Sequence, residues 1–194
     1  MSAVIQTAAA TSLEVKVDAF FRPLALFFSG IVLLTLGSKI YIPIEPVPIT
    51  AQTVALFLIS LTFGHRLAVA SVLGWLGLGA CGLPVFASHL TGVTVFTGPT
   101  AGYLFGFLLV SGVCGYLAEK AKECLSGSLD KLIAISVLGH VILYLSGLWW
   151  LHYFVGSWQN TFLAGLYPFI IGDALKIILV VLCVPGTWKL KNRC

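Results

Sequence analysis

The sequence predicts an all-α integral membrane protein, folded as a single bundle of six transmembrane helices. Of its 194 residues, 59% are hydrophobic and only 9% are charged, whereas a soluble domain carries about 25% charged residues. No Asp, Glu, Lys or Arg occurs from Leu67 to Ala118 or from Leu132 to Gly172. Each of these stretches is long enough for two crossings of about 20 residues and a loop. We therefore expect residues 1–194 to form one membrane domain.

The basic residues predict how this bundle is oriented. If the crossings alternate, nine of the 11 Lys and Arg residues fall on one side, Lys39 falls on the other, and Lys176 lies inside a span. Because cytoplasmic loops carry the excess of Lys and Arg, we expect a multi-pass protein of the cytoplasmic membrane with both termini in the cytoplasm. Residues 1–21 then form a cytoplasmic lead-in, and residues 185–194 a basic cytoplasmic tail. The nine residues are Lys16, Arg22, Arg66, Lys120, Lys122, Lys131, Lys189, Lys191 and Arg193.

The first span is expected over Pro23–Ser38. Pro23 suits the first helical turn, where its missing N–H leaves no intrahelical bond unmade. Ala25 and Ser29 form a small-xxx-small pair, which allows another helix to approach closely. That helix belongs either to the same bundle or to a partner protein.

Two outer segments between spans are predicted to be irregular. Tyr41–Ile49 contains three prolines within six residues, which excludes a regular helix and indicates an extended, stiff loop. Gly82–Leu104 is rich in Gly, Thr and Pro and has no charge. Since irregular backbone at membrane depth needs protein or a water-filled cavity around it, we interpret this segment as re-entrant or as a cap over the outer mouth of the bundle. Gln52, at the start of the second span, faces either a ligand or a neighbouring helix.

The other spans are apolar runs separated by turns and by the polar segment Glu119–Lys131. The fifth span contains His140, and a histidine in such a setting is more often packed or bonded to backbone than a ligand. The same span ends in aromatic residues typical of a membrane interface. The five remaining spans are expected over Thr50–Phe63, Leu67–Cys81, Tyr103–Ala118, Leu132–Leu151 and Pro168–Val184.

The sixth span carries the strongest sign of function, the pair Asp173 and Lys176. An ionisable residue at membrane depth costs roughly 2.5–3.5 kcal/mol on insertion scales and marks a functional site by default. The i,i+3 spacing places both side chains on one helix face, where each partly neutralises the other. Because this span enters from outside, the pair lies in the outer half of the membrane. A structural salt bridge, a binding site for a polar solute and a proton relay are all compatible with it.

Other classes of function lack their residues. The chain has no G-x-x-x-x-G-K-[ST] motif, so it does not bind a nucleotide through a P-loop and does not couple ATP hydrolysis to transport by itself. The five cysteines are scattered without metal-ligand spacing. Asp173 is the only carboxylate in the spans and the histidines lie in separate elements, so we expect no catalytic residue, no metal and no cofactor.

Four motifs in order resemble the BioY family, the biotin-binding S components of energy-coupling factor (ECF) vitamin transporters. They are PVPITAQT (Pro46–Thr53), GLPVF (Gly82–Phe86), GPTAGYLFGF (Gly98–Phe107) and PFIIGDALK (Pro168–Lys176). The resemblance covers about Ala25 to Val184 and implies six helices, an outward-facing substrate pocket and uptake of biotin.

The resemblance also implies roles for single residues. Asp173 would accept a ureido N–H of biotin, and Lys176 would interact with its polar end, most simply the carboxylate. Phe86 and Tyr103 would pack on the thiophane ring and the alkyl chain. Gln52 or His89 would complete the ureido hydrogen bonds.

The implied partners are a transmembrane coupling protein and two ATPase subunits, with no nucleic acid. S components of this type dock through small residues of the first helix, which correspond to Ala25 and Ser29. The serine departs from the alanine pair of the family. A second departure is SHLTGVT (Ser88–Thr94), where relatives are often richer in glycine or carry an amide.

Overall fold

A computed structural model describes residues 2–87, 91–123 and 129–191, and the side chains of 20–87, 91–122 and 129–184. The regular structure of the described chain consists of helices and one two-stranded antiparallel ribbon, in which Tyr41 pairs with Thr50 and Ile42 with Ile49. The elements in order are α1 (Ser2–Lys39), β1 (Tyr41–Ile42), β2 (Ile49–Thr50), α2 (Gln52–Phe63), α3 (His65–Ala80), the 3₁₀ helix η1 (Val93–Thr97), α4 (Ala101–Glu123), α5 (Leu129–Val155), α6 (Trp158–Gly165) and α7 (Tyr167–Lys191).

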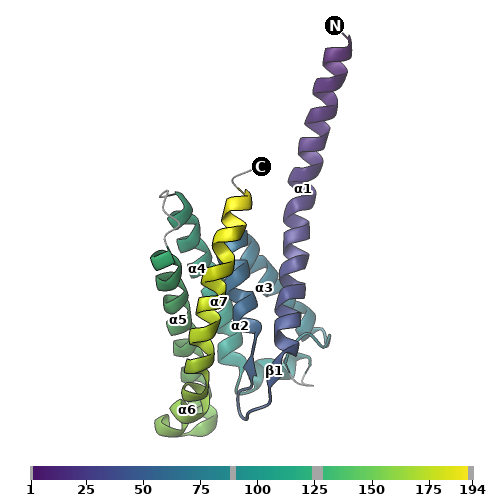
Figure 1. Ribbon diagram of the computed structural model, residues 1–194. Coiled ribbons are helices and arrows are strands. Elements are labelled where there is room, and N and C mark those ends of the chain that lie inside the picture. The colour runs from purple at the N-terminus through teal and green to yellow at the C-terminus, as the bar shows by residue number, and fades with distance from the viewer. Residues whose placement is uncertain (1, 88–90, 124–128, 192–194) are drawn as a thin grey trace.

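The long helices run alternately up and down, and both termini lie at the same end (Figure 1). The ribbon and α6 gather at the opposite end, together with the segment between α3 and α4. Helix α2 is the centre of the bundle, since it packs against α1, α3, α4 and α7. Helix α4 makes its main contact with α5. The predicted all-helical class is confirmed.

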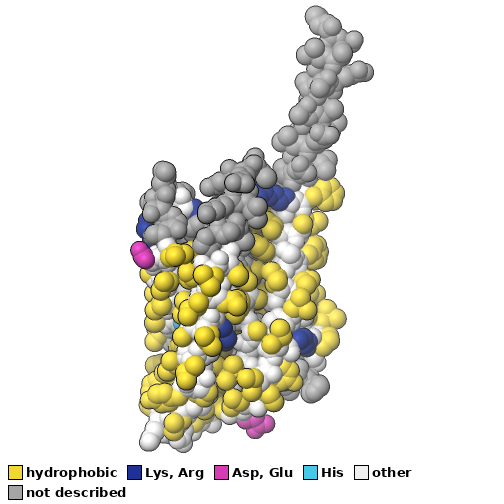
Figure 2. Space-filling model, in the orientation of Figure 1, with side chains coloured by type: hydrophobic (Ala, Val, Ile, Leu, Met, Phe, Trp, Pro, Cys, Tyr) yellow, Lys and Arg dark blue, Asp and Glu magenta, His cyan; other side chains and the backbone are white. Residues whose placement is uncertain are grey.

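Four helical stretches are long and apolar enough to cross a membrane, by length and composition. They are Phe20–Lys39, Ala101–Lys122, Leu129–Val155 and Trp158–Val184. Helix α2 has 12 residues, which correspond to about 18 Å at 1.5 Å per residue. Apolar side chains cover the visible face, and charged side chains are isolated among them (Figure 2). These features define a multi-pass membrane protein.

Two predicted helix ends were wrong. Helix α1 begins at Ser2 and continues through Pro23, which therefore lies inside the helix and not in its first turn. Helix α7 has Pro168 in its first turn, as expected, but it extends past Pro185 to Lys191. A proline removes one hydrogen bond and strains the preceding turn. It kinks a helix without necessarily ending it when the flanking residues remain good helix formers.

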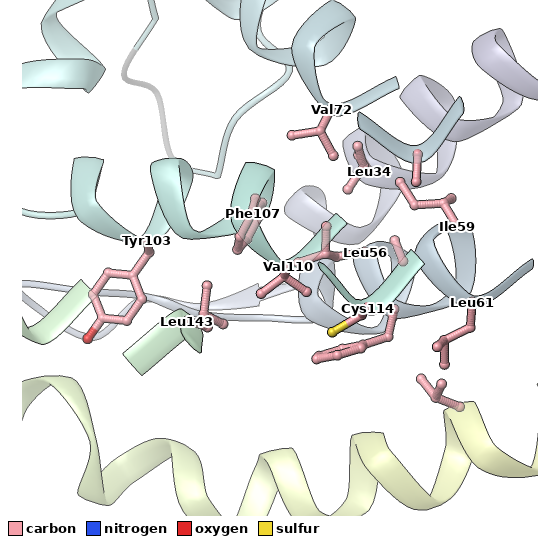
Figure 3. Close-up of a cluster of buried hydrophobic side chains, with 14 of the residues drawn as sticks. Leu34, Leu56, Ile59, Leu61, Val72, Tyr103, Phe107, Val110, Cys114 and Leu143 are labelled. Carbon is pink, nitrogen blue, oxygen red and sulfur yellow. The ribbon is translucent and has the colours of Figure 1, made fainter. Parts of the chain in front are cut away.

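The core surrounds α2 and includes side chains of α1, α3, α4, α5 and α7 (Figure 3). Leu34, Leu56, Ile59 and Val110 have no exposed surface. Glycines allow the helices to approach closely: a Cβ at Gly74 of α3 would lie 2.7 Å from the Phe27 ring of α1. Gly74 thus gives α3 a thin surface on which α1 packs closely.

Candidate functional site

A cavity of about 560 Å³ lies at the end of the bundle opposite the two termini. Its walls come from the proline-rich ribbon, the segment between α3 and α4, and the facing ends of α2, α4, α5 and α7. Described residues from both parts of the segment Gly82–Leu104, before and after 88–90, line the cavity; its interpretation as a cap stays a prediction. Five residues selected from the sequence line this cavity together: Gln52, Phe86, Tyr103, Asp173 and Lys176. Ser88 and His89 lie outside the described residues.

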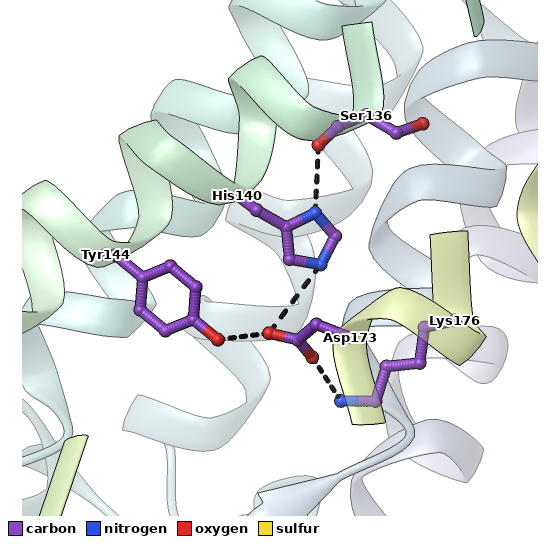
Figure 4. A network of polar contacts seen from close by, with 5 residues as sticks. All are labelled: Ser136, His140, Tyr144, Asp173 and Lys176. Carbon is purple, nitrogen blue, oxygen red and sulfur yellow. Dashed lines mark hydrogen bonds and ion pairs between the residues drawn. The ribbon is translucent and has the colours of Figure 1, made fainter. Parts of the chain in front are cut away.

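Asp173 is the centre of a polar network between α5 and α7 (Figure 4). Its Oδ1 accepts a hydrogen bond from Lys176 Nζ at 2.9 Å, and its Oδ2 accepts one from the Tyr144 hydroxyl. Only 6% of Asp173 is exposed. A carboxylate this deep is tolerated because a cation and a hydroxyl meet it.

His140 lies behind Asp173, one turn of α5 from Tyr144. Its Nδ1 lies 2.8 Å from the Ser136 carbonyl oxygen, so Nδ1 must carry the proton and donate. In the neutral ring, Nε2 then holds a lone pair, and it lies 3.8 Å from Asp173 Oδ2. The ring stacks on Phe57 with centroids 4.6 Å apart. His140 is therefore a packed, backbone-bonded histidine, as expected, and it does not line the cavity.

Two further polar atoms on the cavity wall are buried without a hydrogen-bond partner. They are Gln52 Nε2 and Thr53 Oγ1, both in the first turn of α2. Leaving a buried polar group unpaired costs about 1–3 kcal/mol. Gln52 and Thr53 are thus the residues of α2 that carry an unused hydrogen-bonding atom beside the cavity.

Aromatic rings form the apolar wall. Phe86, Trp75, Phe107 and Phe169 line the cavity, and Phe86 meets Trp75 edge to face with centroids 4.7 Å apart. The Tyr103 hydroxyl donates to the Gly165 carbonyl at 2.9 Å. Its polar group is therefore bonded to the bundle, and the ring is left as an apolar surface.

Sequence reasoning missed Tyr144 and Glu45, which also line the cavity. The sequence did hold a signal for Tyr144: it follows His140 by four residues in the uncharged fifth span, and this i,i+4 spacing places both side chains on one face of that helix. Glu45 lies in the proline-rich segment between the two strands and is exposed. Nothing in the sequence related it to the sixth span.

The cavity suits a small molecule with a polar end and an apolar body. Its volume falls within the roughly 300–1,000 Å³ typical of small-molecule sites. Within the described part of the chain, no group of three or more His, Cys, Asp or Glu residues is arranged to hold a metal ion. The fold and the site define a helical membrane protein that binds a small solute.

Comparisons with known proteins agree with this class. The BioY family model matches residues 7–193, so the chain belongs to the BioY family. The biotin transporter BioY of Thermotoga maritima is 38% identical over 159 residues, covering 82% of this chain and 91% of the relative. The biotin transporter BioY of Rhizobium etli is 34% identical, over 81% of this chain and 87% of that protein.

One solved structure is similar in fold and sequence. It is the crystal structure of the S component for biotin from an ECF-type ABC transporter, with a TM-score of 0.76 and 27% identity. The match covers 92% of this chain and 93% of the other. The family resemblance found in the four motifs is confirmed.

Proposed function

We propose that this chain is the biotin-binding S component of an ECF transporter and takes up biotin across the cytoplasmic membrane. The observation that carries the proposal is the cavity itself, because an ion pair and the polar residues Gln52 and Thr53 line it together with aromatic rings in a member of the BioY family. Relatives named biotin transporters place it among transporter components and not among enzymes.

Biotin has groups that match both the polar and the aromatic residues of the cavity wall. Its ureido ring has two N–H donors, its thiophane ring is apolar, and its valerate chain ends in a carboxylate. In the proposal, Asp173 accepts a ureido N–H, Phe86 and Tyr103 pack on the thiophane ring and the chain, and Lys176 meets the carboxylate. Gln52 or His89 completes the ureido hydrogen bonds.

Asp173 and Lys176 both retain unused hydrogen-bonding sites that such a ligand can occupy. A carboxylate has about four acceptor sites, and Asp173 uses two of them for Lys176 and Tyr144. The Lys176 ammonium has three donors, one of which Asp173 occupies. Both groups line the cavity. The pairing of Lys176 with Asp173 is thus compatible with a direct contact between Lys176 and the ligand.

The proposal includes six crossings with both termini in the cytoplasm and the cavity open to the outside. The alternating helices and the common end of the two termini support it (Figure 1). So does the charge distribution, because nine of the 11 Lys and Arg residues fall on the side of the termini. Helices α2 and α3 are short, with 12 and 16 residues. Other helices pack around both of them, so their lengths need not match the thickness of the hydrocarbon core.

Helix α1 is the proposed docking face for the coupling protein. Ala25 is exposed, in a stripe with Phe21, Phe28 and Val32, each more than half exposed. Ser29 is half-buried, and its hydroxyl donates to the Leu26 carbonyl at 2.9 Å. Its polar group is satisfied within α1, so it presents a small surface to a partner helix. Two ATPase subunits would supply the ATP hydrolysis for which this chain has no P-loop.

Calorimetric titration of the purified protein with biotin tests this proposal. We expect saturable binding with one biotin per chain. Trp75 lines the cavity, so the tryptophan fluorescence should change over the same concentration range. No binding of biotin by folded protein would overturn the proposal.

A further inference from the structure

The carbonyl of Val85 accepts hydrogen bonds from two helices at once. Ser38 Oγ, in the last turn of α1, lies 2.7 Å from it and also 2.7 Å from the Thr35 carbonyl oxygen of its own helix, so its single hydroxyl proton is shared between the two acceptors. Trp75 Nε1 of α3 lies 3.2 Å from the Val85 oxygen. The next carbonyl, that of Phe86, accepts a bond from Lys39 Nζ at 2.8 Å. Three side chains thus hold two consecutive peptide units of a segment outside the helices and strands.

Two of these donors are fully buried. Ser38 and Trp75 have no exposed surface, whereas Lys39 is exposed. Irregular backbone has no regular hydrogen-bond ladder, so each buried carbonyl in it needs a partner from elsewhere. Removing the Ser38 hydroxyl leaves Val85 with one donor in place of two.

The held segment continues directly into the cavity wall. Phe86 follows Val85, lines the cavity, and is in edge-to-face contact with Trp75 and with Phe96. A Cβ at Gly79 would overlap the Phe86 ring. The ring is therefore pressed onto α3 on one side while the carbonyl before it is bonded to α1.

The same end of α1 also lies against a second residue of the cavity wall. A Cβ at Gly37 would lie 2.9 Å from the Cα of Gln52, and Gln52 lines the cavity. The C-terminal end of α1 therefore contacts Val85, next to Phe86, and the backbone of Gln52, while Gly37 and Ser38 themselves do not line the cavity.

We propose that Ser38 is a positioning residue of the binding site. It ties the Phe86 wall to α1, the helix that carries the proposed docking face. This inference rests on the proposed function. It adds a physical route by which a movement of α1 changes the shape of the site. Without the Ser38 hydroxyl, the Phe86 wall opens more often and the ligand leaves faster.

The test compares Ser38→Ala with Ser60→Ala. Ser60 is equally buried, and its hydroxyl donates to Leu56 of its own helix at 2.6 Å, away from the cavity lining. Hydrogen exchange is measured without ligand at the backbone amides of residues 83 and 85–87, since Pro84 has no N–H. We expect at least fivefold faster exchange in Ser38→Ala, no change in Ser60→Ala, and recovery in Ser38→Thr, which restores a hydroxyl. Unchanged exchange in Ser38→Ala would overturn the tie to α1.

The second readout is the dissociation rate of radiolabelled biotin. We expect it to rise five- to 20-fold in Ser38→Ala and less than twofold in Ser60→Ala. Equal rates in the two variants would overturn the positioning role, even if both lose thermal stability. Failure of the parent protein to bind biotin would contradict the proposed function instead. The ligand-free exchange measurement would still decide whether Ser38 holds the segment.

Discussion

The packed centre of the bundle and the cavity at the end opposite the termini differ in what their polar side chains border. In the centre, Ser60 and Ser111 bond to carbonyls of their own helices, and Phe57 fills the space beside Gly139. Around the cavity, Gln52 and Thr53 have unpartnered atoms. Ser136 and His140 of α5 also carry buried atoms without a partner, away from the cavity lining. What distinguishes the cavity is that its polar residues border a space that a small molecule can fill. Substitutions in the two regions should separate stability from binding.

The largest effect on binding is expected for Asp173→Asn. The substitution keeps the shape of the side chain and removes its charge, so charge-assisted bonds to the ligand become neutral ones. A bond to a charged group contributes about 1.5–3 kcal/mol, and loss of one or two weakens biotin binding on the order of 100-fold. Calorimetry on purified protein measures this change.

Asp130→Asn is the matched control. Asp130 is exposed in the first turn of α5, and it does not line the cavity. We expect this variant to bind biotin like the parent. If Asp173→Asn also bound as tightly as the parent, Asp173 would be a structural salt-bridge partner only.

The packed centre is expected to respond in stability. In Gly139→Ala, the new Cβ would lie 2.8 Å from Cys114 Sγ and overlap the Phe57 ring. Overpacking of this kind costs typically about 1–3 kcal/mol. The thermal unfolding midpoint should fall, while the folded fraction binds biotin with unchanged affinity.

Gly112→Ala is the counterpart in α4, because its Cβ would meet only Val69 at 3.7 Å, an ordinary contact. Alanine is the better helix former by up to about 1 kcal/mol, so this variant should be as stable as the parent or more stable. A lower affinity for biotin in Gly139→Ala would show that the two regions are coupled.

Lys176→Ala should affect biotin more than a biotin derivative whose carboxylate is amidated. The lost ammonium pairs with the acid only in biotin itself, and we expect a roughly tenfold larger loss there, since a charge-assisted bond contributes about 1.5–3 kcal/mol. Competition titrations with both ligands measure the ratio. Equal losses would mean that Lys176 acts by neutralising Asp173, to which it is bonded at 2.9 Å.

Tyr144→Phe is expected to have the smallest effect. It retains the ring on the cavity wall and removes the hydroxyl that donates to Asp173. Since the carboxylate keeps Lys176 and gains a free acceptor site, we expect a three- to tenfold loss of affinity, which corresponds to about 1 kcal/mol. A loss as large as that of Asp173→Asn would instead place the Tyr144 hydroxyl on the ligand.

Much of the site followed from the sequence because charge is rare in this chain. Asp173 and Lys176 were identifiable in an apolar helix by their cost and spacing. The structure does bring Gln52, Phe86 and Tyr103 to the same cavity. Their roles toward a ligand remain predictions.

The remainder depends on three-dimensional packing. Tyr144 reads as an ordinary aromatic residue of a buried span until α5 is placed against α7. The bonds of Ser38 and Trp75 to Val85 join residues 47 and 10 positions apart. No local pattern predicts such bonds. The predicted start of α1 and the predicted end of α7 were wrong, because Pro23 and Pro185 were each assumed to mark a helix boundary.

Protection of the cavity from a membrane-impermeant thiol reagent tests the central claim most directly. Thr100, on the cavity wall, is changed to cysteine in a background without the five native cysteines. Gln159→Cys, exposed on α6 and away from the cavity lining, is the control. We predict that biotin slows labelling of Thr100→Cys from outside the cell at least tenfold and leaves Gln159→Cys unaffected. Labelling of Thr100→Cys that biotin does not slow would contradict an outward-facing biotin site.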